Sequence, residues 1–335
     1  MTAEAQERTG ERVTALLGRA GIPAGRIVRH APLTGGTYNG LYVVELTGGE
    51  RLVLKVPPSP DLPRLRYEAE LLYGEALFYR HAAEAEVPAP ALLAAECAEA
   101  ADPYLLMSHR PGVPWYGVAG TMACLERDRL RCELGSLMAR LHAVRGPAFG
   151  YPAQSTGPLT DRWAAAFGAM TDAVLDDAVR YDAWLPLPVD SIREQLAAAA
   201  PVLAEVTVPA LVHFDLWPGN ILLDGPAGER RISALIDGER MMWGDPLADF
   251  ASLSLLLGDA ERDSAFLSGY AAGGGRGDFD GPALRRIALY RCYLCLIMLI
   301  ETVPRRTGGE TLAWVRTEVA DRLVAALRAA AGPRG

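Results

Sequence analysis

Two short apolar runs, residues 221–223 and 232–236, are flanked on one side by oxygen-bearing side chains. Both runs have the length of short strands, and the Gly- and Pro-containing segment between them predicts a hairpin. In that hairpin Asp215 and Asn220 lie just before the first strand, and Asp237 follows the second. Their oxygens would meet at one end of a two-stranded ribbon, where carboxylate and amide groups suit Mg²⁺. The alternative is three ordinary turn residues, because Asp and Asn are common in turns.

The size and charge of the chain limit what it can be. Its 335 residues suit one large or two packed domains, and a hydrophobic content of 50% is that of a globular protein. The formal net charge of −8 argues against nucleic acid as the main partner, since phosphate backbones need a basic surface. The N-terminal segment lacks the pattern of a signal peptide, and the longest apolar run, residues 292–300, is far too short to span a membrane. We therefore expect a cytoplasmic protein that binds neither nucleic acid nor a membrane.

One lysine stands out among the basic residues. The chain has 33 Lys and Arg residues, and Lys55 is the only lysine. It lies in an apolar strand predicted over residues 51–56, where a charged side chain is costly unless an anion meets it. The sequence therefore favours a phosphate-binding lysine over a surface lysine.

A Gly-rich stretch precedes this strand. Gly35, Gly36, Thr37 and Tyr38 lie between two predicted strands, where glycine lets backbone N–H groups approach phosphate oxygens. The motif is short, so a plain β-turn is the alternative.

A helix predicted from about residue 65 to residue 85 offers three acidic partners for Lys55. Glu75 lies on or beside the apolar stripe of this helix, and Glu68 and Glu70 are its rivals. One of the three is needed for an ion pair with a buried lysine, and the sequence leaves the choice open.

Two further predicted strands, residues 91–95 and 104–107, would complete a five-stranded sheet. The extended segment 108–112 follows and contains a Pro-Gly turn, which indicates a hinge between two lobes. We therefore expect an N-terminal lobe over residues 1–108 and a C-terminal lobe over residues 109–335.

The second lobe is predicted to be mainly helical. Residues 161–200 carry seven acidic residues against three Arg, which indicates either a solvated charged face or a wall that attracts a cationic substrate. Cys292 and Cys295 lie in an apolar helix and are expected to be core thiols rather than a zinc or redox pair. The helices are expected over residues 127–142, 161–200, 247–257, 260–271, 284–301 and 310–330.

These features occur in an order that resembles a known family. The segment from His213 to Asn220 reads H-x-D-x-x-x-x-N, Asp237 follows an isoleucine, and Gly244-Asp245-Pro246 leads to Asp249. Together with the Gly-rich stretch and Lys55, this order is similar to that of the aminoglycoside phosphotransferase family, relatives of the protein kinases that include choline, homoserine and fructosamine kinases. The resemblance implies an α+β, protein-kinase-like fold with a small five-stranded antiparallel N-terminal lobe and a large helical C-terminal lobe.

The resemblance also implies roles for individual residues. Asp215 would orient the acceptor hydroxyl or take its proton, and Asn220 and Asp237 would hold Mg²⁺. Lys55, held by Glu75, would bind the phosphates of ATP, with GTP as the alternative donor. His213, Asp245 and Asp249 would support the catalytic loop. Backbone groups would receive the rest of the nucleotide: those near Met107 and His109 for the adenine, and those of Gly35, Gly36, Thr37 and Tyr38 for the phosphates.

The chain departs from the family pattern near the acceptor. Phe214 replaces a small residue, commonly Gly, and Glu239 and Arg240 follow the metal-binding Asp237. With Trp217, these two residues are the candidates for substrate contact. Residues 285–335 contain nine Arg and four acidic residues, which disfavours a polycationic acceptor and favours a neutral or mixed-charge antibiotic such as a nucleoside, macrolide or cyclic peptide.

The function expected from this reading is an ATP- and Mg²⁺-dependent transfer of a phosphoryl group to a hydroxyl of a small molecule, an antibiotic in the leading interpretation. Resistance or self-protection of a producer would be its purpose. The alternatives are a kinase of a primary metabolite, with a choline-, homoserine- or sugar-like alcohol as acceptor, and a catalytically inactive nucleotide-binding regulator. The sequence leaves open whether the protein is a monomer or a homodimer.

Overall fold

The computed structural model describes residues 3–33, 39–97 and 100–332, and the statements that follow concern these residues. The strands are β1 (Ile27–Pro32), β2 (Gly40–Leu46), β3 (Arg51–Val56), β4 (Leu92–Glu96), β5 (Tyr104–Ser108), β6 (Val113–Pro114), β7 (Ala210–Val212), β8 (Ile221–Asp224), β9 (Arg231–Leu235) and β10 (Met242–Gly244). The α-helices are α1 (Ala3–Arg19), α2 (Leu71–Glu84), α3 (Trp115–Val118), α4 (Cys124–Ala143), α5 (Trp163–Arg180), α6 (Val189–Ala199), α7 (Asp249–Leu257), α8 (Ser264–Ala272), α9 (Gly281–Ile300), α10 (Gly309–Trp314) and α11 (Ala320–Ala331).

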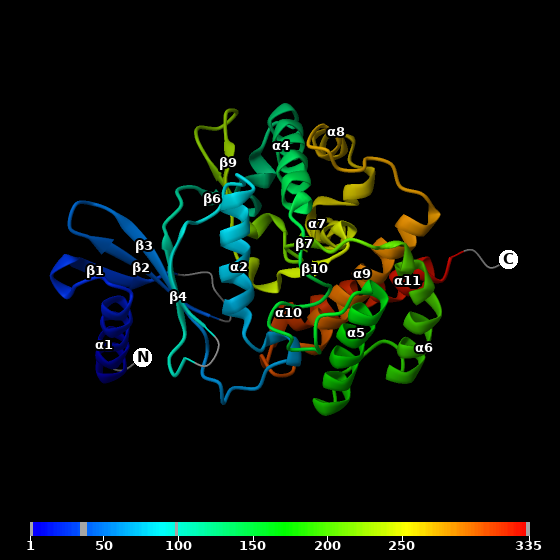
Figure 1. Ribbon diagram of the computed structural model, residues 1–335, viewed down its shortest axis with the longest axis horizontal. Coiled ribbons are helices and arrows are strands. Elements are labelled where there is room, and N and C mark those ends of the chain that lie inside the picture. Colours follow the sequence, from blue (N-terminus) through cyan, green and yellow to red (C-terminus); the bar gives the residue numbers. More distant parts are fainter. Residues whose placement is uncertain (1–2, 34–38, 98–99, 333–335) are drawn as a thin grey trace.

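The N-terminal part is a five-stranded sheet with the order β1-β2-β3-β5-β4, in which every neighbouring pair is antiparallel. Along β3 the residues alternate between the two faces. Leu52 and Leu54 belong to the same buried core cluster as Leu17 of α1, so Lys55 lies on the opposite face. Figure 1 shows α2 standing between this sheet and the helical part of the molecule. The predicted five-stranded antiparallel sheet is confirmed.

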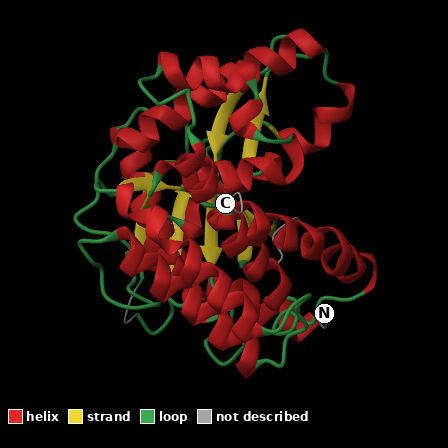
Figure 2. Cartoon of the chain, turned by 90° about the vertical axis from the view of Figure 1, so that its right-hand side faces the viewer, coloured by secondary structure: helices red, strands yellow, loops and turns green. Residues whose placement is uncertain are grey.

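The rest of the chain is mainly helical and is built around α9. Its residues Tyr290, Tyr293, Leu294 and Ile297 are almost completely buried, as the apolar composition of this segment predicts. Helices α5, α7 and α11 all contact α9. Figure 2 shows the molecule from the right-hand side of Figure 1, where helices lie in front of the strands. The fold therefore belongs to the predicted α+β class. Among the described residues, no helix has the length and apolar composition that crossing a membrane requires.

The predicted helix from residue 65 to residue 85 begins later than expected. Glu70 has a left-handed backbone with φ 62°, so regular α-helical hydrogen bonding cannot pass through it, and α2 starts at Leu71. Residues 66–68 form a single 3₁₀ turn. The backbone N–H of Leu65, directly before this turn, donates to the Glu68 side chain at 2.7 Å. Glu68 and Glu70 therefore lie outside the helix, and only Glu75 of the three acids belongs to it.

Two other predicted segments are interrupted. The helical stretch 161–200 divides into α5 and α6, because Pro186 and Pro188 lie in the loop between them. The segment 310–330 forms α10 and α11, joined by a π-helical turn over Val315–Val319. Cys292 and Cys295 are buried free thiols of α9, as predicted.

The hairpin predicted around residues 221–236 forms, but it is not a two-stranded ribbon. β8 pairs with β9, and β6 adds a third strand along the other edge of β8. A second pair, β7 with β10, was not predicted, because three-residue strands carry too little pattern to recognise. β7 ends directly before His213 and β10 ends directly before Asp245, so this pair anchors both ends of the segment that carries the candidate site.

Helices α4 and α8 approach each other closely at glycine residues. A side chain at Gly135 of α4 would overlap the carbonyl oxygen of Phe266, and one at Gly269 of α8 would overlap that of Cys132. The close approach requires that neither position carries a Cβ atom.

Replacing Gly135 by Ala should therefore lower the free energy of unfolding by about 2–3 kcal/mol, because the two backbones must move apart. The control is Gly168→Ala in α5, where an added Cβ meets nothing within 4 Å. That change should leave stability unaltered or raise it by about 0.5–1 kcal/mol, since alanine favours the helix over glycine. Urea denaturation measures both effects, and equal midpoints for the two variants would contradict the packing argument.

Candidate active site

Three carboxylates converge on the ammonium group of Lys55. The Nζ atom lies 2.6 Å from Glu75 Oε2, 2.6 Å from Asp237 Oδ1 and 2.8 Å from Glu239 Oε2. Lys55 comes from β3, Glu75 from α2, and the other two acids from the turn after β9. The cluster therefore joins the sheet, the helix beside it and the loop after the hairpin.

Tyr79 supports this cluster from α2, one turn after Glu75. Its hydroxyl donates to Glu75 Oε1 at 2.8 Å and accepts from the backbone N–H of Asp237 at 3.2 Å. The sequence analysis did not identify Tyr79. Its spacing of four residues from Glu75 on the same helix face was the only signal available.

Burial and charge act against each other in the cluster. Burial raises the pKa of Glu75 to about 7, although Lys55 opposes the shift, and burial also raises the pKa of Glu239. Burial disfavours the charge of Lys55, but the three acids outweigh it and hold the Lys55 pKa well above its ordinary value. Burial works against ionised Asp237 as well, yet Lys55 lowers the pKa of this side chain, which is 39% exposed. Lys55 is therefore held in its ammonium form and Asp237 in its ionised form.

The segment after β7 holds Asp215 and Asn220 together. The Asn220 amide group donates to the Asp215 backbone oxygen at 2.8 Å and to its Oδ2 at 3.3 Å. His213 accepts from the Asp215 backbone N–H through Nδ1, so its Nε2 carries the proton that is donated to the Ile236 carbonyl at 3.0 Å. Burial lowers the pKa of His213, which fits this neutral form.

Asp249 fixes the backbone of the same segment. Its carboxylate accepts from the backbone N–H groups of His213 at 3.1 Å and Phe214 at 2.7 Å, and from His142 Nε2 at 3.0 Å. Phe214 has a left-handed backbone with φ 59°, a region that favours glycine. This explains why a residue without a side chain suits the position, and why Phe214 needs the Asp249 hydrogen bonds to stay there.

Asp245 stabilises the turn that leads to Asp249. Its carboxylate accepts from the Leu247 backbone N–H at 3.0 Å, from Arg286 at 2.9 Å and from the Tyr290 hydroxyl at 2.7 Å. All of these contacts are internal, so the side chain anchors this turn to α9.

A chain of alternating charges reaches Asp215 from the other side. Arg240 lies 3.4 Å from Asp215 Oδ1 and 3.3 Å from Glu301, and Arg305 links Glu301 at 3.1 Å to Glu68 at 2.6 Å. Burial raises the pKa of Asp215 to about 7, with Arg240 as the main opposing influence. Of these residues, Arg240 was predicted from the sequence as a substrate contact and Glu68 only as a partner of Lys55, whereas Glu301 and Arg305 were not predicted.

The remaining predicted residues occupy separate places. Met107 is buried in β5, and the backbone N–H of His109 donates to the Arg51 carbonyl at 3.1 Å. Trp217 packs beside Tyr116, with ring centroids 5.8 Å apart. The predicted residues Gly35, Gly36, Thr37 and Tyr38 lie outside the described residues.

The donor set of the site fits a divalent cation. Glu75, Asp237 and Glu239 can bring one carboxylate oxygen each within 4.8 Å of one another, and a single Lys55 charge faces all three. Because the Asn220 amide nitrogen is committed to Asp215, its oxygen is the atom left for a metal. Hard oxygen donors and an excess of negative charge are what Mg²⁺ prefers.

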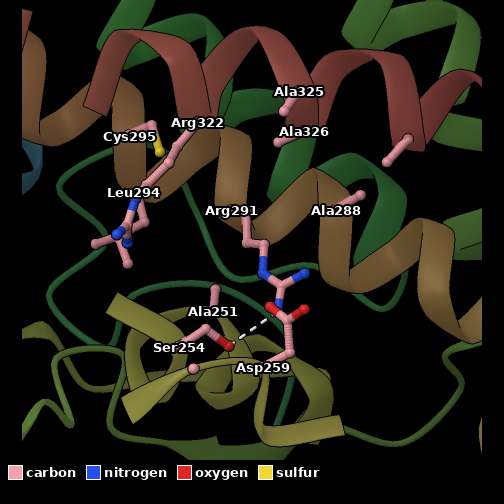
Figure 3. Close-up of a pocket in the computed structure, with 12 residues that line it drawn as sticks. Ala251, Ser254, Asp259, Ala288, Arg291, Leu294, Cys295, Arg322, Ala325 and Ala326 are labelled. Carbon is pink, nitrogen blue, oxygen red and sulfur yellow. Dashed lines mark hydrogen bonds and ion pairs between the residues drawn. The ribbon is translucent and has the colours of Figure 1, made fainter. Parts of the chain in front are cut away.

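A cavity of about 460 Å³ lies away from these clusters, between α7, α9 and α11 (Figure 3). Arg291 enters it from α9 and donates to Ser254 at 2.8 Å and Asp259 at 3.0 Å. None of the residues predicted for the site is among its described lining residues. Arg291 and Asp259 of this cavity are thus paired with each other.

Sequence comparison matches most of the chain to a known protein family. A model of the phosphotransferase enzyme family matches residues 29–290, which include Lys55, Asp215 and Asp237. No curated protein sequence matches the chain.

Several solved structures share the fold. A candidate fructosamine-3-kinase from Thermobifida fusca YX-ER1 is 21% identical, with a TM-score of 0.66 over 94% of this chain and 99% of its own. A thermostable mutant of aminoglycoside phosphotransferase APH(4)-Ia, solved with AMP-PNP and hygromycin B, is 22% identical, with a TM-score of 0.62 over 95% and 98%. A choline/ethanolamine kinase family protein from Mesorhizobium loti is 20% identical, with a TM-score of 0.59 over 96% and 99%. The likeness establishes a kinase-like fold.

Replacing Lys55 by Met removes the cation that faces three acids. We expect the free energy of unfolding to fall by about 3–5 kcal/mol near pH 8, because buried Glu75 loses its partner. The loss should be smaller near pH 5. The pKa of Glu75 is about 7 in the folded protein and 4.5 in the unfolded chain, so between these pH values only the folded protein keeps the Glu75 proton. The contribution of Glu75 to stability therefore falls as pH rises through this range. Urea unfolding at both pH values measures the difference.

The double variant Lys55→Met/Glu75→Gln is the control, since it leaves no buried charge at Glu75. It should recover part of the stability lost at pH 8. Equal destabilisation of the single and double variants at both pH values would show that the ion pair does not govern stability here.

Proposed function

The chain belongs to the phosphotransferase enzyme family, and from this premise we propose that it transfers the γ-phosphate of ATP to a hydroxyl group of a small molecule. The observation that carries the proposal is the grouping of Lys55, Glu75 and Asp237 in one ion cluster, with Asp215 and Asn220 held together on the segment before the same hairpin. The cluster supplies a cation for phosphates, and the segment supplies a carboxylate for the acceptor.

Each residue has a proposed task. Lys55 binds phosphate oxygens, and Glu75 keeps its ammonium group in place. Asp237 and Asn220 would hold Mg²⁺, which neutralises phosphate charge when bound. Asp215 orients the acceptor hydroxyl and takes its proton, and its pKa of about 7 suits a base that works near neutral pH. The proposed reaction depends mainly on positioning and charge neutralisation by these side chains.

The acceptor must be inferred from this chain, because its fold neighbours carry the names of kinases for three different acceptors. Near Asp215 the acid Glu301 is neutralised by Arg240 and Arg305. On α5, Asp172 and Asp176 both pair with Arg193. These three acids, which could have attracted a polycation, are thus engaged within the protein. We infer an acceptor that is neutral or of mixed charge, with an antibiotic such as a nucleoside, macrolide or cyclic peptide as the leading class.

The variant Asp215→Asn tests the proposed reaction. It keeps the size of the side chain but cannot take a proton, so turnover of ATP with an acceptor should fall by at least about 100-fold. The dissociation constant for ADP should change little, because Lys55 and Asp237 remain. Product mass spectrometry and ADP titration give the two values, and turnover within a few-fold of the unsubstituted protein would disprove the role of Asp215.

A panel of acceptors tests the charge argument. Neutral or mixed-charge compounds (a nucleoside antibiotic, a macrolide and a cyclic peptide) should include one that gains a phosphoryl group, while hygromycin B and choline should not. Mass spectrometry of each mixture after incubation with Mg²⁺ and ATP detects the product. Phosphorylation of choline or hygromycin B alone would reject the neutral acceptor and leave the phosphotransferase assignment standing.

A further inference from the structure

Three carboxylate groups surround the ammonium group of Lys55 in this structure. The Nζ atom donates hydrogen bonds to Asp237 at 2.6 Å and to Glu239 at 2.8 Å, and Glu75 Oε2 forms an ion pair with it at 2.6 Å. Since Lys55 is only 3% exposed, water has almost no access to it. A phosphate oxygen can bind Lys55 only when one of the three carboxylates leaves.

Two of the three acids are held in place by other contacts. The second oxygen of Glu75 accepts from the Tyr79 hydroxyl at 2.8 Å, and its side chain is almost completely buried in α2. The backbone N–H of Asp237 donates to the same hydroxyl, which fixes this residue beside α2. These acids can remain when an anion approaches.

Glu239 is attached differently. It belongs to the short turn Gly238–Arg240, and its Oε2 atom accepts from Lys55 and also from the side-chain amide of Asn39 at 2.7 Å. Asn39 is the first described residue after the Gly-rich stretch. The two donors on one Glu239 oxygen, an ammonium and an amide, are the kind of pair that would also suit a phosphate oxygen.

We propose that Glu239 is a built-in competitor of the nucleotide, occupying the phosphate position at Lys55 and Asn39 until a nucleotide displaces it. This inference rests on the proposed function, because it assumes that Lys55 receives nucleotide phosphates. Glu239 thereby lowers nucleotide affinity and keeps the buried lysine paired when the site contains no nucleotide.

The energetic reason is the cost of exchanging partners. The nucleotide must break the contacts of Glu239 with Lys55 and Asn39, and it then brings negative charge next to the displaced carboxylate. The measured affinity is reduced by the fraction of protein in which Lys55 is available. A variant without the Glu239 charge avoids this cost, so it should bind nucleotide more tightly.

The experiment measures ADP binding by isothermal titration calorimetry for the full-length protein and the variants Glu239→Gln and Glu239→Ala, each with EDTA and with Mg²⁺. We expect the dissociation constant of both variants to fall about tenfold in each condition, as removal of a competing internal contact predicts. Thermal unfolding of each variant confirms that the protein is folded during the titration.

The matched control is Glu229→Gln. Glu229 lies in the exposed turn between β8 and β9, at the end of the hairpin away from Asp237, and the substitution removes the same charge. Its ADP affinity should match that of the unsubstituted protein. If Glu229→Gln tightens binding as much as Glu239→Gln does, overall charge explains the effect and the proposal fails.

The remaining outcomes are also decisive. Unchanged ADP affinity in both Glu239 variants would overturn the proposal while leaving the phosphotransferase assignment intact. Weaker binding with Mg²⁺ would overturn it as well and would indicate that Glu239 contacts the metal. If neither the unsubstituted protein nor any variant binds ADP, ATP or GTP, the proposed function fails and this inference fails with it.

Discussion

The arrangement of the site depends on the buried ammonium group of Lys55. A lysine placed on the inner face of a sheet loses its hydration, and only close anionic partners can offset that cost. Here the partners come from α2 and from the turn after β9, so one side chain fixes the position of three elements far apart in the sequence. Removing these acids would leave the buried Lys55 ammonium without a partner. The positions of the surrounding elements therefore depend on the balance of charge at this lysine.

The second constraint is the backbone of the segment from His213 to Asn220. Phe214 adopts a conformation that glycine tolerates better, and Asp249 stabilises it by accepting from two successive backbone N–H groups. The Asp249 carboxylate, which stabilises this strained backbone, is buried and also contacts His142. The orientation of Asp215 therefore depends on buried residues beside it, because they determine where its backbone lies.

Part of this site could be predicted from the sequence because its signals are local. Asp215 and Asn220 lie five residues apart, and Lys55 is recognisable from its apolar neighbours. The ion pairs between Arg240 and Glu301 and between Glu68 and Arg305 join residues 61 and 237 positions apart, where no local pattern exists. The start of α2 was predicted wrongly for a different reason. The left-handed backbone of Glu70 interrupts the helix, and helix propensity alone does not reveal it.

The two ionic clusters differ in their charge balance, and the difference bears on what each can bind. Around Lys55 three acids face one base, so this cluster can accept a cation or release a carboxylate to an incoming anion. In the other cluster Arg240 and Arg305 alternate with Asp215, Glu301 and Glu68, so three acids face two bases and every charge has an ion-pair partner. A cationic or anionic group entering there would have to break an existing ion pair, whereas a hydroxyl group would not. Under the proposed function, charge would therefore enter the site on the Lys55 side, and the side next to Asp215 would receive an uncharged part of the acceptor.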